Sequence, residues 1–72
     1  MRTIDLKNIV WKEDRSYIAW NLNTGISSFG VSRKEALAAL HEALELYFED
    51  SLITKVQKVE RPDIVPMTFE YA

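Results

Sequence analysis

The sequence predicts an α+β fold: a three-stranded antiparallel meander with one helix packed on one face and a C-terminal edge strand. Three observations predict it. Residues 32–50 have the composition and spacing of an amphipathic helix. Three short segments before the helix are rich in β-branched and aromatic residues, and polar turns separate them. The last segment, Met67 to Tyr71, alternates apolar and polar residues, as an edge strand does.

The first predicted strand covers Met1 to Lys12. Ile4 and Leu6 alternate with polar neighbours, but the apolar run at residues 9–11 breaks this alternation. Three consecutive apolar residues in a strand indicate either burial on both faces or a β-bulge. The sequence leaves both alternatives open.

The second and third predicted strands are Tyr17 to Leu22 and Ile26 to Val31. The turn between them contains Gly25, which supplies a positive φ. Because the connections between the strands are short, we expect antiparallel neighbours.

Both faces of the second predicted strand are largely apolar. We expect Tyr17 and Ala19 to face the helix, because the small Ala19 side chain allows the helix to approach closely. One helix covers one face of such a sheet. Ile18, Trp20 and Leu22 are therefore expected on the open face.

The predicted helix begins with a capping box. The Ser32 oxygen accepts from the N–H of Glu35, and the Glu35 carboxylate accepts from the N–H of Ser32. The interior contains neither Gly nor Pro. Apolar residues recur at helical spacing and form one stripe: Ala36, Leu37, Leu40, Ala43, Leu44, Tyr47 and Phe48. This stripe predicts the side of the helix that faces the core.

The outer side of the predicted helix is acidic. Glu42, Glu45 and Glu49 fall opposite the apolar stripe, and residues 32–50 sum to −3 from two basic and five acidic residues. Two interpretations stay open: a solvated helix face, or an acidic patch that recruits a basic partner. The three glutamates are the candidates for the second interpretation.

The segment Ser16 to Asp50 resembles the HicB-like antitoxin domain. The resemblance lies in a strand with Tyr-Ile-Ala, a Gly turn, a short strand ending in Gly, a Ser cap, and a helix with two Glu-Ala-Leu repeats. The residues that carry it are Tyr17, Ile18, Ala19, Gly25, Gly30, Ser32, Glu35, Ala36, Leu37, Leu40, Glu42, Ala43 and Tyr47.

The resemblance implies a partial RNase H-like fold and a function in a prokaryotic toxin–antitoxin system. Members of this family bind a small basic RNA-cleaving toxin of the HicA type and block its active site. Many also carry a DNA-binding module after this domain. For this chain we expect a single HicB-like domain over residues 1–72, without a separate DNA-binding domain and without direct binding of nucleic acid.

Composition limits the other function classes. The chain has 72 residues, no cysteine and a formal net charge of −2. Without cysteine there is neither a disulfide nor a cysteine-based metal site, and the charge gives no basic footprint for nucleic acid. There is no 18-residue apolar run and no signal-peptide pattern, so we expect a cytoplasmic protein.

Catalytic chemistry is not indicated. His41 is the only histidine, and no second histidine or cysteine stands near it. The aspartates are scattered along the chain, whereas a two-metal nuclease needs carboxylates that converge on ions ~4 Å apart. We therefore expect a non-enzymatic protein with no catalytic residue, no metal and no cofactor. The aromatic residues are expected in the core or at a protein interface rather than in a base-stacking platform.

A homodimer or higher oligomer is expected, because a domain this small buries only ~60% of its unfolded surface and one helix leaves a sheet face uncovered. The candidate contact residues are Ile18, Trp20, Leu22, Leu46, Met67, Phe69 and Tyr71. Whether the C-terminal strand pairs within the chain or with a neighbour stays open. The alternative function is a stand-alone oligomeric protein of the same fold with a structural or small-ligand-binding role and no toxin.

Overall fold

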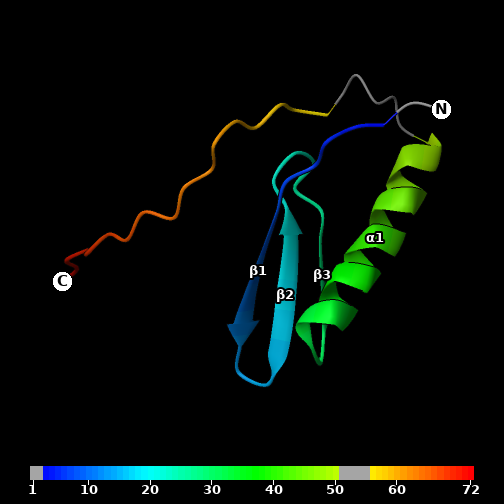
Figure 1. The fold of residues 1–72 in the computed structure, drawn as a ribbon. Helices are drawn as coiled ribbons and strands as arrows, with labels where there is room; N and C mark the ends of the chain where they lie inside the picture. Colours follow the sequence, from blue (N-terminus) through cyan, green and yellow to red (C-terminus); the bar gives the residue numbers. More distant parts are fainter. Residues whose placement is uncertain (1–2, 51–55) are drawn as a thin grey trace.

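Three strands precede one helix in the chain: β1 (Asn8–Glu13), β2 (Ser16–Asn21), β3 (Ser27–Gly30) and α1 (Arg33–Asp50). The computed structural model describes residues 3–50 and 56–72 (Figure 1). The strands form one antiparallel sheet in the order β1-β2-β3. The predicted α+β meander with one helix is therefore confirmed.

β1 and β2 form a hairpin with a two-residue turn. The register runs without interruption from Asn8 opposite Asn21 to Glu13 opposite Ser16. Asp14 in the turn has a φ of 54°, a conformation that aspartate adopts more readily than most residues. Because no residue is inserted, the apolar run at residues 9–11 is not a bulge, and its members alternate between the two faces of the sheet.

β1 is shorter than predicted at its start. Residues 3–7 are not part of the strand, and Met1 and Arg2 lie outside the described residues. The N–H of Lys7 donates to the side-chain oxygen of Asn23 at 2.8 Å instead of to a strand backbone. The ladder therefore begins after Lys7. β3 is also shorter than the predicted segment, by one residue at each end.

The core lies between α1 and one face of the sheet. Its buried members are Ala19, Ala36, Leu40 and Leu44, and the partly buried Leu6, Val10, Tyr17, Ile26, Leu37 and Phe48 pack around them. The predicted position of Tyr17 and Ala19 toward the helix is confirmed. Burial of Leu40 and Leu44 contributes roughly 1.5–3 kcal/mol each before chain entropy is subtracted.

Gly30 allows the start of α1 to approach β3. A Cβ atom at Gly30 would lie 2.7 Å from the Ala36 nitrogen and 2.7 Å from the Glu35 Cβ. These neighbours belong to the first turn of the helix, whose backbone cannot move without displacing the core. A glycine is therefore required at this position by close packing rather than by its backbone angles.

The helix N-terminus is capped as the sequence predicts. The Ser32 hydroxyl accepts from the N–H of Glu35 at 3.1 Å, and the Ser32 carbonyl accepts from the N–H of Ala36 at 3.0 Å. The reciprocal bond from the Ser32 N–H to the Glu35 carboxylate is not formed between these two described residues. One bond of the predicted capping box is thus present.

The predicted C-terminal edge strand is not formed within the chain. Residues 56–72 contain no strand, and the side chains of Met67, Phe69 and Tyr71 are 78–90% exposed. Figure 1 shows this segment running away from the sheet on the side opposite α1. Pro62 and Pro66 each lack an N–H donor, so residues 62–66 cannot form an uninterrupted ladder that would bring Met67 to Tyr71 back along the sheet of the same chain.

Replacing Gly30 by alanine should destabilise the fold by about 1–3 kcal/mol, because the added methyl group overlaps the first turn of α1. The free energy of unfolding is measured by urea denaturation. Ser27→Ala, at an exposed position in the same strand, is the matched control and should change it little. Equal stabilities of Gly30→Ala and the wild type would contradict this account of the helix contact.

Candidate functional site

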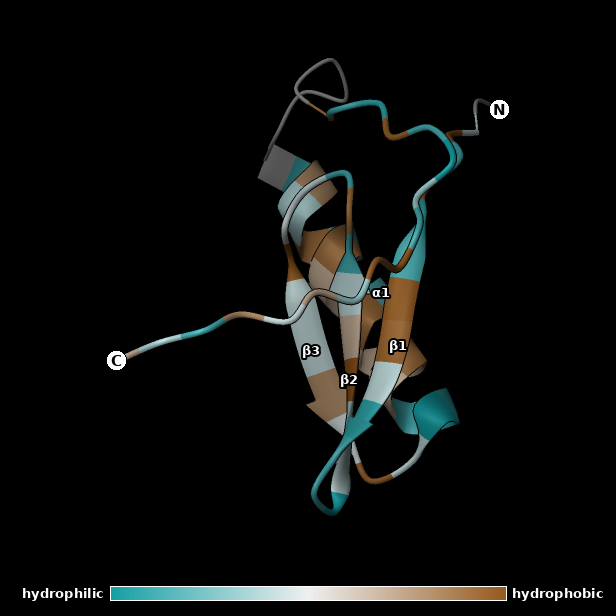
Figure 2. Ribbon diagram, turned by 90° about the vertical axis from the view of Figure 1, so that its left-hand side faces the viewer, coloured by the Kyte–Doolittle hydropathy of each residue, from teal (hydrophilic) through white to brown (hydrophobic). Residues whose placement is uncertain are grey.

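Five apolar side chains line the sheet face opposite α1, and we call them the open face: Ile9, Trp11, Ile18, Trp20 and Phe29. Ile9 pairs with Trp20, and Ile18 lies between Trp11 and Phe29. Directly opposed residues in a sheet carry their side chains on the same face. Trp11 is 40% exposed, Trp20 is 41% exposed and Phe29 is 69% exposed. Figure 2 views the sheet from this side, with α1 behind it.

An uncovered apolar surface of this kind is typical of interaction sites rather than of a free monomer surface. No helix of the described residues covers it, since α1 occupies the other face (Figures 1 and 2). The open face is therefore a candidate docking surface.

The predicted contact residues lie in four different places. Ile18 and Trp20 belong to the open face. Leu22 lies beyond the end of β2, where its N–H donates to the Lys7 carbonyl at 2.9 Å, and its side chain is half-buried. Leu46 is 65% exposed on α1, on the other side of the molecule from the open face. The remaining predicted residues lie in the C-terminal segment.

The C-terminal segment, residues 62–72, carries a second exposed apolar surface, and we call this segment the tail. Its large apolar side chains are 73–90% exposed, and they are Ile64, Val65, Met67, Phe69 and Tyr71. Pro62 to Ile64 line a groove of about 320 Å³ together with Asn8, Ile9 and Val10. The tail thus starts beside β1 and then leaves the body of the protein with its apolar side chains unburied.

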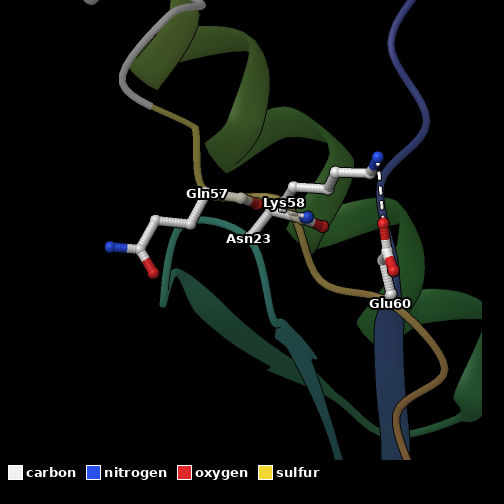
Figure 3. A network of polar contacts seen from close by, with 4 residues as sticks. All are labelled: Asn23, Gln57, Lys58 and Glu60. Carbon is white, nitrogen blue, oxygen red and sulfur yellow. Dashed lines mark hydrogen bonds and ion pairs between the residues drawn. The ribbon is translucent and has the colours of Figure 1, made fainter.

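Asn23 fixes the chain just before the tail. Its side-chain nitrogen donates to the Gln57 carbonyl at 2.7 Å, and the N–H of Gln57 donates to the Asn23 carbonyl at 3.2 Å (Figure 3). The side-chain oxygen of Asn23 accepts from Lys7. One asparagine therefore joins the segment before β1, the turn after β2 and the segment that leads to the tail. An exposed ion pair of 3.0 Å between Lys58 and Glu60 follows.

Asn21 is the second buried polar residue of this turn. It is fully buried, and its side-chain nitrogen donates to the Asn8 oxygen at 2.8 Å. Its side-chain oxygen accepts from the N–H and the hydroxyl of Thr24, at 2.9 and 2.7 Å. Buried amides that are paired in this way specify one arrangement, because each broken bond leaves a desolvated polar group. Their residue type and spacing in the sequence did not predict this role for either asparagine.

The exposed side of α1 is acidic, as its sequence predicts. Glu42, Glu45 and Glu49 line a shallow groove of about 360 Å³ with Leu46. His41 Nδ1 lies 3.0 Å from a Glu45 oxygen, and both side chains are well exposed, so this contact adds little stability. The three glutamates that the sequence singled out thus lie on one exposed surface, which we call the acidic face.

A larger groove of about 450 Å³ adjoins the acidic face. Its apolar lining comes from Ile4, Leu6, Leu44 and Phe48, and its remaining lining residues are His41, Glu45 and Glu49. Glu45 and Glu49 line both grooves. An apolar floor beside carboxylates is a surface that suits a basic, amphipathic partner.

In the part of the chain that the structure describes, no metal-binding cluster of side chains is formed. No three His, Asp or Glu side chains form a cluster there, and every buried side-chain nitrogen or oxygen has a hydrogen-bond partner. Within residues 3–50 and 56–72, no helix has the length and apolarity needed to cross a bilayer.

Comparison with known proteins identifies one family. The model of a family described as a family of unknown function, DUF7387, matches residues 2–69. No curated protein and no solved structure matches the chain significantly. The match extends over the sheet, the helix and most of the tail.

Replacing Asn23 by aspartate should release the segment before the tail. The carboxylate is nearly isosteric and still accepts from Lys7, but it has no proton to donate to Gln57. We expect a loss of about 1–3 kcal/mol in unfolding free energy and faster hydrogen exchange at the Gln57 amide.

The matched control is Gln57→Ala. Both bonds use the Gln57 backbone, and its exposed side chain points away from Asn23 (Figure 3). This variant should keep wild-type stability and exchange. If Gln57→Ala were as harmful as Asn23→Asp, the asparagine would not be the anchor.

Proposed function

The chain belongs to the DUF7387 family, whose function is unknown, and we propose that it is a non-enzymatic protein-binding module of the antitoxin type. Its partner on this proposal is a small basic RNA-cleaving toxin of the HicA type, whose active site it blocks. The observation that carries the proposal is the acidic face beside an apolar groove, formed by Glu42, Glu45, Glu49 and Leu46.

The chemistry of this surface supports a basic partner. The three carboxylates lie on one side of α1, and the exposed Leu46 and the neighbouring groove supply apolar contact area. Charge of one sign steers an oppositely charged protein toward the surface, and apolar contacts then stabilise the complex. The HicB-like order of strands, glycines and helix cap supports the choice of a toxin as that partner. Such a module needs no cofactor, and we place it in the cytoplasm.

A second candidate function rests on a different observation. The open face and the tail together carry ten large apolar side chains, five in each, that are exposed in whole or in part. They lie on the side of the molecule opposite the acidic face. They support a stand-alone oligomeric protein of the same fold, with a structural or small-ligand role and no toxin. A toxin-sized basic reading frame beside the gene favours the first function, and its absence favours the second.

The direct test is to look for a small basic protein encoded beside the gene and, where one is encoded, to purify it and measure its RNA cleavage with and without this chain. The antitoxin proposal predicts a stoichiometric complex and complete inhibition at equimolar amounts. Unchanged cleavage, with no complex at micromolar concentrations, would exclude that protein as the target and reject the proposal in favour of the oligomeric alternative.

Neutralising the acidic face should slow association with that toxin. The triple variant Glu42→Gln, Glu45→Gln and Glu49→Gln should lower the association rate at low salt by about tenfold, because steering by these charges is lost. Salt screens exposed charges, so the difference should shrink at high ionic strength.

The matched control is the triple variant Glu13→Gln, Asp14→Asn and Glu60→Gln, which changes the net charge equally but leaves the acidic face intact. It should keep an association rate near that of the wild type. An association rate that does not depend on salt, or equal effects of the two triple variants, would remove the acidic face from the proposal.

The chain itself should not cleave RNA. Incubation of the pure protein with structured RNA and Mg²⁺ or Mn²⁺ should give no product above the buffer control, because no carboxylate cluster is found among the described residues. Metal-dependent cleavage that a single Asp→Asn substitution abolishes would contradict a non-enzymatic function.

A further inference from the structure

Two complementary apolar surfaces occur on the same chain without covering each other. The open face consists of strand residues whose side chains point away from α1. The tail carries large side chains that are 73–90% exposed. We propose that the tail of one copy lies along β1 of a second copy and covers part of its open face, and that the second copy does the same in return.

The tail is held away from its own sheet. Arg61 has a φ of 48°, an unfavourable conformation for an arginine, and it redirects the chain immediately before Pro62. Figures 1 and 2 show the tail on the side of the open face, crossing the direction of the strands rather than running along them. Its side chains stay exposed, so its own open face does not receive them.

The tail is also stiffened in an extended conformation, which suits it to pair with a strand of a partner. Proline fixes its own φ, and it biases the preceding residue toward extended conformations, so Pro62 and Pro66 stiffen the segment. A segment that is already extended loses less conformational entropy on docking than a flexible one. The anchor at Asn23 fixes where this segment begins.

β1 is an edge strand that offers a place for an added strand. In the described part of the chain it pairs only with β2. A peptide that joins a sheet edge gains backbone hydrogen bonds, and its alternate side chains fall on the two faces. Residues after Pro66 retain all their N–H donors, so Met67 to Tyr71 can form such a ladder.

The side-chain pattern of the tail fits both faces at β1. Met67, Phe69 and Tyr71 share one side of an extended segment and join the open face beside Ile9 and Trp11. Thr68 and Glu70 then fall on the other side, the side on which the register places Lys12 of β1. Opposite charges at neighbouring cross-strand positions are favourable. The groove beside Asn8 to Val10 leaves room for the incoming side chains.

The contact is large enough for a specific dimer. A covered aromatic side chain buries roughly 150–250 Å². Two reciprocal tails, together with the surfaces that they cover, bury on the order of 2,000 Å², which is the size of specific protein interfaces. The partner is therefore a second copy of this chain. In the dimer, each tail docks on the open face of the other copy.

Sedimentation of full-length variants tests the exchange. The wild type should be a dimer at micromolar concentrations. Phe69→Glu in the tail and Trp11→Glu on the open face of β1 should each weaken the dimer by on the order of 30-fold or more. Thr68→Glu introduces the same charge on the other side of the tail and should remain dimeric. Circular dichroism confirms that each variant is folded, and Ile9→Glu replaces Trp11→Glu if that variant is not.

Mixing the two weakened variants gives the sharpest result. The tail of the Trp11→Glu chain is intact, and so is the open face of the Phe69→Glu chain, so the mixture should form a heterodimer with one complete contact. A mixture that stays monomeric overturns the exchange. A Phe69→Glu variant that stays dimeric assigns the interface to two open faces packed together and overturns the exchange as well. A monomeric wild type assigns the open face to a different protein and also overturns the proposal.

Discussion

The close approach of α1 to the sheet is the contact on which the rest of the structure depends. It is possible because Gly30, Ala19 and Ala36 present little or no side chain where the helix crosses the strands. Leu40 and Leu44 then fill the core further along the helix. A single helix packed this tightly covers one sheet face and leaves the other without a layer.

The uncovered face follows from this arrangement. The buried asparagines connect the segment that leads to the tail with the core. Asn21 and Asn23 lie at the end of β2, inside the fold, yet their hydrogen bonds reach the segment before β1 and the segment before the tail. The position of the tail is therefore set by the interior of the domain. The acidic face lies on the outer side of α1, so a basic partner and a second copy would use separate surfaces.

Elements with a strong local signal could be predicted from the sequence. The helix, its Ser32 cap, its buried stripe and the position of Ala19 follow from spacing and residue type alone. The limits of β1 could not be predicted, because they depend on where the Lys7 backbone finds its hydrogen-bond partner, a turn residue distant in sequence. The role of Asn23 was missed for the same reason. Met67 to Tyr71 alternates like a strand, but alternation does not reveal whether a neighbouring strand exists in the same chain.

The claim that the open face is a docking surface is tested most directly by tryptophan fluorescence. Both tryptophans of the chain, Trp11 and Trp20, belong to that face and are about two-fifths exposed. As the protein concentration rises, their emission should shift to shorter wavelength, and acrylamide should quench it less. Emission and quenching that do not change with protein concentration would contradict the claim.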